Sequence, residues 1–209
     1  MNKALDLTVA AVLLPILVVL SILAPVGKKR MLDLALALIL LVVLAPVSIG
    51  IIIALYFTQR SIIFRQERLG REGRPFRLYK FVTMRPGADG WIVQNANDPR
   101  ITRIGRLLRA TALDEIPELI NVLKGEMSIV GPRPMPRWEH DVCKATIAGW
   151  NGRLSVKPGL IGLAQLKCHR ADNATKLEYD MQYIRRQSFG LDLKLIALGL
   201  LANLKAKWV

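Results

Sequence analysis

The stretch LDEIPELINVLKGEMSIVGPRP, residues 113–134, decides how the rest of this chain is interpreted. Two acids, Asp114 and Glu115, stand side by side at the predicted start of a short helix. Asp114 is predicted as its N-cap, which places Pro117 in the first turn, where a missing N–H donor costs little. Gly125 is the expected C-terminal stop. Because a helix N-terminus stabilises carboxylates and lowers their pKa, we expect Asp114 to be ionised.

Adjacent acids at a helix start are usually caps, but an ionised carboxylate can also act as a nucleophile toward a phosphoryl or glycosyl centre. A phosphate electrophile repels the acid, so nearby cations or a divalent metal must offset that repulsion. Arg109 and Arg133 flank the acids in sequence, and Lys80 ends a basic strand. Arg133 lies between two prolines, which predicts a rigid backbone and a guanidinium pre-set for bidentate phosphate binding.

The chain around this stretch is strongly basic. Its 209 residues include 30 Lys and Arg against 16 Asp and Glu, a formal charge of +14. This balance favours anionic partners: nucleic acid, phosphorylated small molecules or an anionic lipid leaflet. Cys143 and Cys168 form no recognisable framework and suit unpaired thiols in a reducing cytosol.

Two apolar segments, residues 4–26 and 31–57, open the chain, and each exceeds the roughly 20 residues that span a bilayer. Both ends of the second segment are basic, so the positive-inside rule places both on the cytoplasmic face, which a straight span cannot satisfy. Pro46 near its centre can bend a helix sharply. Residues 28–58 are therefore predicted as a re-entrant helix-break-helix hairpin; the alternative is a transmembrane helix with a proline kink.

Residues 1–27 form an extra apolar membrane segment, which either spans the membrane or is a second re-entrant element. Residues 59–209 are predicted as a cytosolic-face domain of the α+β class, mainly helical with a small β-hairpin and with interfacial amphipathic helices. Its predicted elements are a strand-turn-strand over 61–84, a mobile loop over 85–98, helices near 101–109 and 175–187, a glycine-rich loop over 155–162 and an interfacial helix over 189–209. The arginines of the 101–109 helix form either a solvated face or a surface for membrane or anions.

The other motifs say little about function. His140 and Cys143 have metal-like spacing, but two ligands do not make a zinc site, and a surface pair is the simpler interpretation. The sequence holds no Walker-type loop and no dinucleotide fingerprint.

Together these residues resemble the bacterial sugar transferase family, the monotopic polyprenyl-phosphate phosphoglycosyl transferases. The resemblance runs from about Lys29 to the C-terminus. It rests on motifs in one order: Lys29-Arg30-x-x-Asp33, Gln66-x-Arg68-x-Gly70, Phe76-x-x-Tyr79-Lys80-Phe81, Asn97-Asp98-Pro99-Arg100-x-Thr102-x-x-Gly105, the 113–134 stretch, Lys157-Pro158-Gly159-Leu160-Ile161-Gly162-Leu163-Ala164-Gln165, and Tyr179-Asp180-x-x-Tyr183.

The resemblance implies that a sugar 1-phosphate passes from a UDP-sugar to undecaprenyl phosphate and that UMP leaves, which initiates lipid-linked glycan assembly. It makes Asp114 the site of a covalent phosphosugar intermediate and Glu115 its catalytic partner, with Mg²⁺ near both acids. The substrate- or phosphate-binding side chains that it implies are Lys80, Arg109, Arg133 and Asp180. It also implies a membrane hairpin broken at Pro46.

The implied enzyme lies in the bacterial cytoplasmic membrane, with its catalytic domain on the cytoplasmic face. Its expected partners are a UDP-sugar, polyprenyl phosphate and membrane lipid, without nucleic acid, and the oligomeric state stays open, as does the identity of the sugar. The chain departs from the family pattern at Val82 and at positions 169 and 170, where the matching arginine is ambiguous; residues 1–27 lie outside the family core.

The competing interpretation is a membrane-tethered basic protein that binds anionic lipid or nucleic acid without catalysis. The Asp114-Glu115 pair discriminates between the two, because a binding protein has no use for ionised acids inside a cationic site.

Overall fold

The computed structural model describes residues 27–59, 61–85, 87, 98–168 and 171–204. The predicted first apolar segment lies outside these residues. Most of the predicted 85–98 loop and both candidate positions for the family arginine, 169 and 170, lie outside them as well.

The second apolar segment forms two helices with a bend between them. Helix α2 (Lys28–Val43) and helix α3 (Ala45–Thr58) meet at Leu44 with a bend of 60°. Pro46 lies in the first turn of α3, where its missing N–H breaks no bond, whereas its ring prevents α2 from continuing. Among the described residues, neither helix alone is long and apolar enough to cross a membrane, and this bent pair qualifies by length and composition only. The predicted helix-break-helix is confirmed.

Both helices expose large apolar side chains. Those with more than half of their surface exposed are Leu38, Ile39, Val42, Val43, Ile49, Ile53, Tyr56 and Phe57. So many exposed large apolar side chains on two neighbouring helices are unusual for a protein that meets only water.

The predicted strand-turn-strand is an antiparallel hairpin of β1 (Ile63–Leu69) and β2 (Pro75–Phe81), joined through the 3₁₀ turn η1 (Arg71–Gly73). A second, parallel pair joins β3 (Ser128–Val130) to β4 (Gly159–Ile161). The sequence predicted neither strand and indicated only a glycine-rich loop at residues 155–162, where β4 lies. Two strands of three residues that are so far apart in the sequence leave no local pattern. A Cβ on Gly159 would lie 2.1 Å from the nitrogen of Gly131, so this crossing requires glycine.

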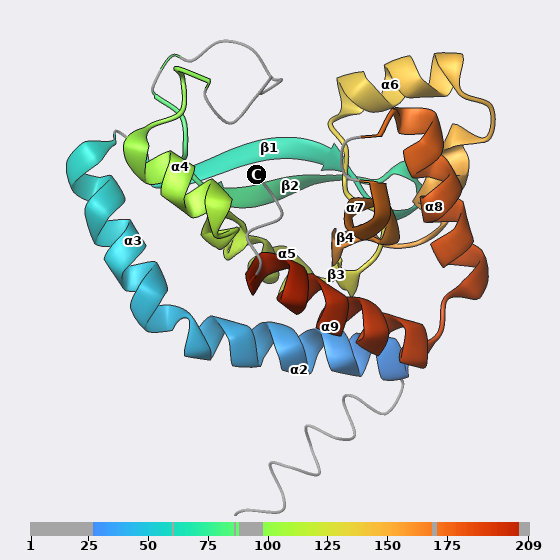
Figure 1. Cartoon of the computed structure of the whole chain (residues 1–209), viewed down its shortest axis with the longest axis horizontal. Coiled ribbons are helices and arrows are strands. Elements are labelled where there is room, and N and C mark those ends of the chain that lie inside the picture. Colours follow the sequence, from blue (N-terminus) through green and yellow to red (C-terminus); the bar gives the residue numbers. More distant parts are fainter. Residues whose placement is uncertain (1–26, 60, 86, 88–97, 169–170, 205–209) are drawn as a thin grey trace, which may run out of the picture.

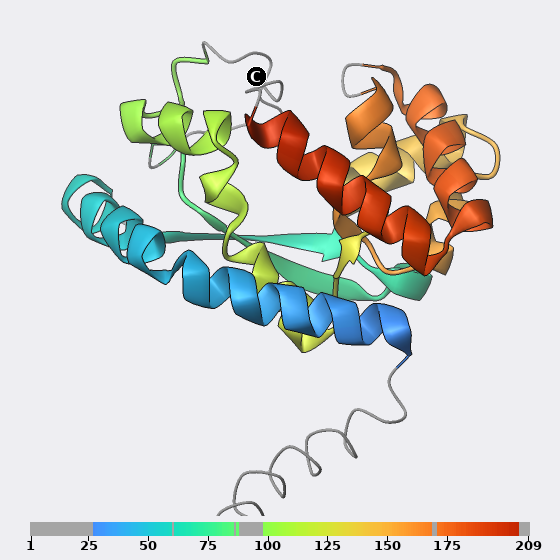
Figure 2. The same cartoon turned by 60° about the horizontal axis from the view of Figure 1, so that its bottom comes forward.

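Helices surround these two small sheets, which confirms the mainly helical α+β prediction. Figures 1 and 2 show α2 along one side of the molecule, with α3 at one end and α6 and α8 at the other. The remaining elements are α4 (Arg103–Ala110), η2 (Leu113–Glu115), α5 (Glu118–Lys124), α6 (Arg137–Thr146), η3 (Trp150–Ser155), α7 (Leu163–Cys168), α8 (Asn173–Arg186) and α9 (Phe189–Leu204). The helices predicted near 101–109, 175–187 and 189–209 correspond to α4, α8 and α9.

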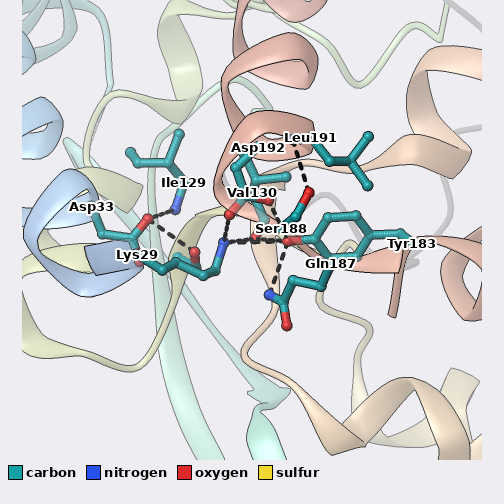
Figure 3. Close-up of polar contacts among 10 residues, drawn as sticks. Lys29, Asp33, Ile129, Val130, Tyr183, Gln187, Ser188, Leu191 and Asp192 are labelled. Atoms are coloured by element: carbon teal, nitrogen blue, oxygen red, sulfur yellow. Dashed lines mark hydrogen bonds and ion pairs between the residues drawn. The ribbon is translucent and has the colours of Figure 1, made fainter. Parts of the chain in front are cut away.

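Polar side chains in the first turns of α2 attach it to the rest of the chain (Figure 3). The buried carboxylate of Asp33 accepts hydrogen bonds from the Ser128 hydroxyl and from the Ile129 backbone N–H, both at 2.9 Å. The Lys29 ammonium lies 2.7 Å from Asp192 of α9 and donates to the Val130 carbonyl at 3.0 Å. The basic N-terminal end of α2 is therefore joined to β3 and α9.

Arg30 makes a further attachment at the C-terminus of α5. Its guanidinium donates to the carbonyls of Val122 and Leu123, at 2.5 and 2.9 Å. The Val122 carbonyl already accepts from the Gly125 N–H, and the last carbonyls of a helix carry partial negative charge, so a cation there is stabilising. These contacts fix α2 relative to α5, the helix that follows the two acids.

Helix α4 packs against the chain just after β2, and this contact predicts a test of the fold. A Cβ on Gly105 would lie 2.0 Å from the Thr83 carbonyl oxygen, so Gly105→Ala must push α4 away. We expect a loss of about 1–3 kcal/mol in unfolding free energy, measured by thermal or denaturant unfolding in detergent. The control is Gly190→Ala, where the added methyl meets no atom within 4 Å; equal stability of the two variants would contradict the packing.

Candidate functional site

The two acids lie in a tight 3₁₀ turn between α4 and α5. Ala112 adopts a left-handed conformation, φ 54°, which stops α4 and turns the chain into η2. Asp114 is therefore inside η2, and the prediction that it caps the following helix is wrong: α5 begins at Glu118 and is preceded by Pro117. Gly125 ends α5 in a left-handed conformation, φ 82°, as predicted.

Asn121 docks α5 onto the free edge of β2. Its side-chain oxygen accepts from the Tyr79 N–H at 3.1 Å, and its amide nitrogen donates to the Arg77 carbonyl at 2.7 Å. Asn121 is fully buried, so both bonds are made away from water, where an unpaired amide is costly. This docking sets the first turn of α5 beside Lys80, the residue after Tyr79.

The Lys80 ammonium is shared by three carboxylates. It lies 2.5 Å from Glu115, 3.1 Å from Glu118 and 4.0 Å from Asp114. Burial lowers the pKa of this amine, but Glu115 and Glu118 outweigh that effect and the net pKa is raised. Lys80 is therefore a fixed positive charge at the centre of the site.

Arg133 supplies the second cation. Its Nη2 donates to the same oxygen of Glu115, Oε1, at 2.7 Å, so Lys80 and Arg133 both bind this one atom. Burial by itself raises the pKa of the Glu115 carboxyl, yet Arg133 and Lys80 hold it well below its usual range. Glu115 in turn raises the pKa of the Arg133 guanidinium. Glu115 is thus ionised and strongly neutralised.

Asp114 differs from its neighbour. Within the described part of the chain its carboxylate accepts no hydrogen bond, and its closest cation is Lys80 at 4.0 Å. The expectation of a lowered pKa is wrong: burial raises the pKa of Asp114, and Glu115 adds to this, against opposing effects of Lys80, Arg109 and Arg133. Desolvation outweighs the helix-end effect here because Asp114 is only 8% exposed. The result is a carboxylate that is held near cations without being bonded to them.

Glu118 is a third acid that the sequence analysis did not single out. It is 1% exposed and faces Lys80 from the first turn of α5. Burial raises its pKa to about 7, while Lys80 opposes this shift. Its spacing from Glu115, three residues in a helical stretch, is the signal that could have placed it on the same side.

Arg109 approaches the acids from α4. Its Nε donates to the Thr83 hydroxyl at 2.9 Å, and burial lowers the pKa of its guanidinium. Arg103 and Arg106 of the same helix are exposed to the surroundings. The helix thus divides its arginines between an exposed face and the site.

Asp180 lies apart from the three acids. It is buried in α8, and its carboxylate lies 2.8 Å from Nη2 of Arg153, which also donates to the Arg133 carbonyl at 2.9 Å. The structure therefore connects Asp180 to the backbone of Arg133 through Arg153, and not directly to the three acids. Its predicted substrate-binding role stays a prediction.

His140 and Cys143 are both buried, so the expectation of a surface pair is wrong. The Nδ1 atom of His140 accepts from the Trp150 indole N–H at 3.1 Å, which gives the imidazole a structural partner. Among the described residues, no group of three or more His, Cys, Asp or Glu side chains is placed to hold a metal by itself.

Comparison with known proteins gives consistent matches. Residues 23–206 match the family described as bacterial sugar transferase. The chain is 39% identical over 179 residues to UDP-glucose:undecaprenyl-phosphate glucose-1-phosphate transferase of Klebsiella pneumoniae, a match that covers 81% of this chain and 38% of that protein. It is 38% identical over 178 residues to a protein of the same name from Caulobacter vibrioides, with 81% and 67% covered.

A third relative carries a different sugar in its name. The chain is 34% identical over 175 residues to UDP-N-acetylgalactosamine-undecaprenyl-phosphate N-acetylgalactosaminephosphotransferase of Aeromonas hydrophila, with 80% of this chain and 41% of that protein covered. The chain thus spans less than half the length of the Klebsiella and Aeromonas proteins.

The raised pKa of Glu118 predicts how stability changes with pH. A carboxyl whose folded pKa, about 7, exceeds its ordinary 4.5 contributes stability below 4.5, and this contribution is lost as the pH rises through 7. Glu118→Gln removes this titration, so the stability of the variant relative to the parent should rise between about pH 5 and about pH 8. Thermal unfolding across this range checks it, with the exposed Glu178→Gln as control; a constant difference would show that Glu118 does not titrate there.

Proposed function

Because the chain belongs to the bacterial sugar transferase family, we propose that it transfers a sugar 1-phosphate from a UDP-sugar to polyprenyl phosphate and releases UMP. The observation that carries the proposal is the unequal environment of the acids. Glu115 accepts hydrogen bonds from Lys80 and Arg133, and Glu118 lies 3.1 Å from the Lys80 ammonium. Asp114 lies 4.0 Å from that ammonium and accepts no hydrogen bond within the described residues. A carboxylate in that state is available to react. The names of the relatives supply the substrate classes, a UDP-sugar and undecaprenyl phosphate.

In the proposed first step, an oxygen of Asp114 attacks the phosphorus that carries the sugar. The bond from this phosphorus to the bridging oxygen breaks, and its electron pair leaves with UMP. In the second step, a phosphate oxygen of polyprenyl phosphate attacks the same phosphorus, the bond to Asp114 breaks, and the carboxylate is regenerated. Splitting the transfer in this way replaces one difficult displacement with two easier ones.

The cations around Asp114 answer the repulsion between an acid and a diphosphate. Lys80 is already held by two carboxylates, so its charge stays in place when substrate arrives. Arg133 is the more exposed of the two cations, with 43% of its side chain accessible, and is suited to bind phosphate oxygens. Arg109 adds charge from α4. Fixed charges of this kind stabilise a transition state without having to reorganise.

Magnesium fits this site only together with substrate. The donors are the carboxylate oxygens of Asp114 and Glu115, and one oxygen of Glu115 already binds two cations. Mg²⁺ in enzymes is commonly held by one or two carboxylates with substrate phosphates and water completing its shell, which this donor set allows. We therefore place Mg²⁺ near these two acids, where it would neutralise charge on the diphosphate.

The lipid acceptor calls for a site at a membrane, and the α2–α3 pair supplies an apolar surface for one. Its exposed side chains, the 60° bend and the basic residues at both ends support a re-entrant hairpin in the cytoplasmic membrane, with the catalytic domain on the cytoplasmic face. The exposed leucines of α9, among them Leu200 and Leu201, suit an interfacial helix.

Asp114→Asn should abolish UMP release from a UDP-sugar and polyprenyl phosphate while leaving membrane association intact, because the amide cannot act as the nucleophile. The loss should be at least about 1,000-fold, the scale seen when a covalent catalyst is removed. A panel of UDP-sugars assayed with the parent protein identifies the sugar. Turnover unchanged in the variant would refute the mechanism, and a parent protein inactive with every sugar while binding anionic vesicles would favour the non-catalytic binding protein.

A covalent intermediate should be visible without the acceptor. Incubation of the parent protein with its UDP-sugar alone should add the mass of one sugar phosphate to the peptide that contains Asp114, measured by mass spectrometry. The Asp114→Asn protein is the control and should gain none. Turnover without any adduct would point to direct transfer, with Asp114 acting only on the metal.

The re-entrant hairpin predicts that both of its ends face the same side. Single cysteines at exposed positions before and after it, Gly27→Cys and Ser61→Cys, should react with a membrane-impermeant maleimide from the cytoplasmic side only. Both are placed in a background that lacks Cys143 and Cys168, and Val47→Cys near the bend should be protected. Labelling of the two ends from opposite sides would establish a transmembrane helix instead.

A further inference from the structure

The backbone that carries Arg133 is hydrogen-bonded at four consecutive carbonyls. The Pro132 carbonyl accepts from the Gly159 N–H at 2.9 Å, and the Met135 carbonyl accepts from the Leu69 N–H at 3.2 Å. The two carbonyls between them accept from side chains: Arg133 from Arg153 at 2.9 Å, and Pro134 from Arg68 at 3.1 Å. The donors come from β4, from the end of β1 and from η3, so three separate elements meet on one short turn.

This arrangement is unusual because the turn belongs to neither a helix nor a sheet at these residues. Pro132 and Pro134 have fixed φ angles and donate no N–H, which leaves the turn few donors of its own. Each carbonyl therefore depends on a donor brought from elsewhere. Two of these donors are buried or half-buried guanidinium groups, a costly choice where a neutral donor would have satisfied the carbonyl.

Arg153 is itself held in place by an acid. Its side chain is 7% exposed, and its Nη2 lies 2.8 Å from the Asp180 carboxylate, whose side chain is 2% exposed. The guanidinium also stacks on the Trp150 ring, 4.7 Å from the ring centroid, and contacts the Met135 sulfur. A buried ion pair of this kind is often no more stabilising than a well-packed apolar pair, so its presence calls for a further reason.

We propose that Arg153, held by Asp180, and Arg68 are positioning residues for Arg133. They fix the Pro-Arg-Pro backbone so that the Arg133 guanidinium stays beside Glu115 and is pre-oriented for the diphosphate of the substrate. The inference rests on the proposed function for the identity of that substrate. Both act through Arg133, because Arg153 donates to the Arg133 carbonyl and Asp180 lies 2.8 Å from the Arg153 guanidinium.

The proposal explains how Arg133 can be 43% exposed and still keep its guanidinium beside Glu115. Its own side chain has one described partner, the Glu115 oxygen, and a long side chain in water loses considerable rotamer entropy when it is held. Fixing its backbone from both sides removes part of the freedom that would otherwise be lost on substrate binding. Misplacement of a positioned group by 1 Å can cost about 100-fold in rate, so fixing the backbone of Arg133 matters for catalysis.

The test replaces the buried pair as a unit. Arg153→Met with Asp180→Asn removes both charges together, which avoids leaving one charge unpaired inside the fold. We expect kcat for UMP release to fall by about 10- to 100-fold, with a smaller change in KM, because a transition-state contact is weakened. The control is Leu177→Ala. Leu177 lies one turn before Asp180 and packs in a small apolar cluster with Trp150 and Met135, so this variant should lower thermal stability without this loss of kcat.

A double-mutant cycle separates positioning from general destabilisation. In an Arg133→Ala background, the paired replacement should change kcat by less than about twofold, because the residue that the pair positions is gone. The same loss of kcat in both backgrounds would overturn the proposal. Arg153→Lys should retain part of the activity, because an ammonium can keep one of the two contacts of Arg153. Activity as low as that of Arg153→Met would weigh against the hydrogen bond to the Arg133 carbonyl.

A measurement that needs no turnover completes the test. Phenylglyoxal modifies accessible guanidinium groups, and its rate at Arg133 is followed by mass spectrometry of the corresponding peptide. We expect faster modification in the paired replacement than in the parent protein, and no change in Leu177→Ala. Equal rates in all three proteins would refute the positioning role. If the parent protein turns over no UDP-sugar, the proposed function fails, and the modification rates still decide whether Arg153 fixes Arg133.

Discussion

A single, largely buried ammonium, that of Lys80, allows three carboxylates to lie close together. Without it, Asp114, Glu115 and Glu118 would repel one another in a medium that screens charge poorly, and the acids would take up protons. The position of Lys80 depends on the register of the β1–β2 hairpin, where it pairs with Phe64. A slip of one residue would turn Lys80 to the opposite face of the sheet and leave the acids without their cation. The hairpin, the docking of α5 and the turn at Arg133 are all organised around this charge.

The cations are distributed unequally among the acids, and this gives each acid a different chemistry. Glu115 receives Lys80 and Arg133 on one oxygen, so it is neutralised and rigid. Glu118 is buried deeper and has a raised pKa of about 7. Asp114 has the longest contact with Lys80, 4.0 Å, which suits the nucleophilic role proposed for it. Environments that push the pKa values of neighbouring acids apart are how one site assigns them separate roles.

Much of this architecture could be predicted from local sequence patterns. The bend at Pro46, the strand-turn-strand and the stop at Gly125 each follow from residues within a few positions of one another. The parallel β3–β4 pair could not be predicted, because its strands are brief and its partners lie about thirty residues apart. The predicted lowering of the Asp114 pKa was wrong for a related reason. A helix-end effect is local, whereas burial depends on what the rest of the chain packs over the site. Glu118 and Arg153 were missed because their partners, Lys80 and the Arg133 carbonyl, are distant in sequence.

The contacts at the start of α2 connect the bent α2–α3 pair to the elements that carry the acids and Arg133. Arg30 binds the last carbonyls of α5, and Glu118 stands at the other end of that same seven-residue helix. Asp33 binds the first residues of β3, and the strand leads at once into the turn that carries Arg133. Because short, packed elements move as rigid units, the position of the α2–α3 pair also sets the position of α5 and of the carboxylates around Lys80. Under the proposed function, an α2–α3 pair seated in a lipid bilayer would therefore hold Asp114 and its neighbours at a fixed height relative to the phosphate of the lipid acceptor.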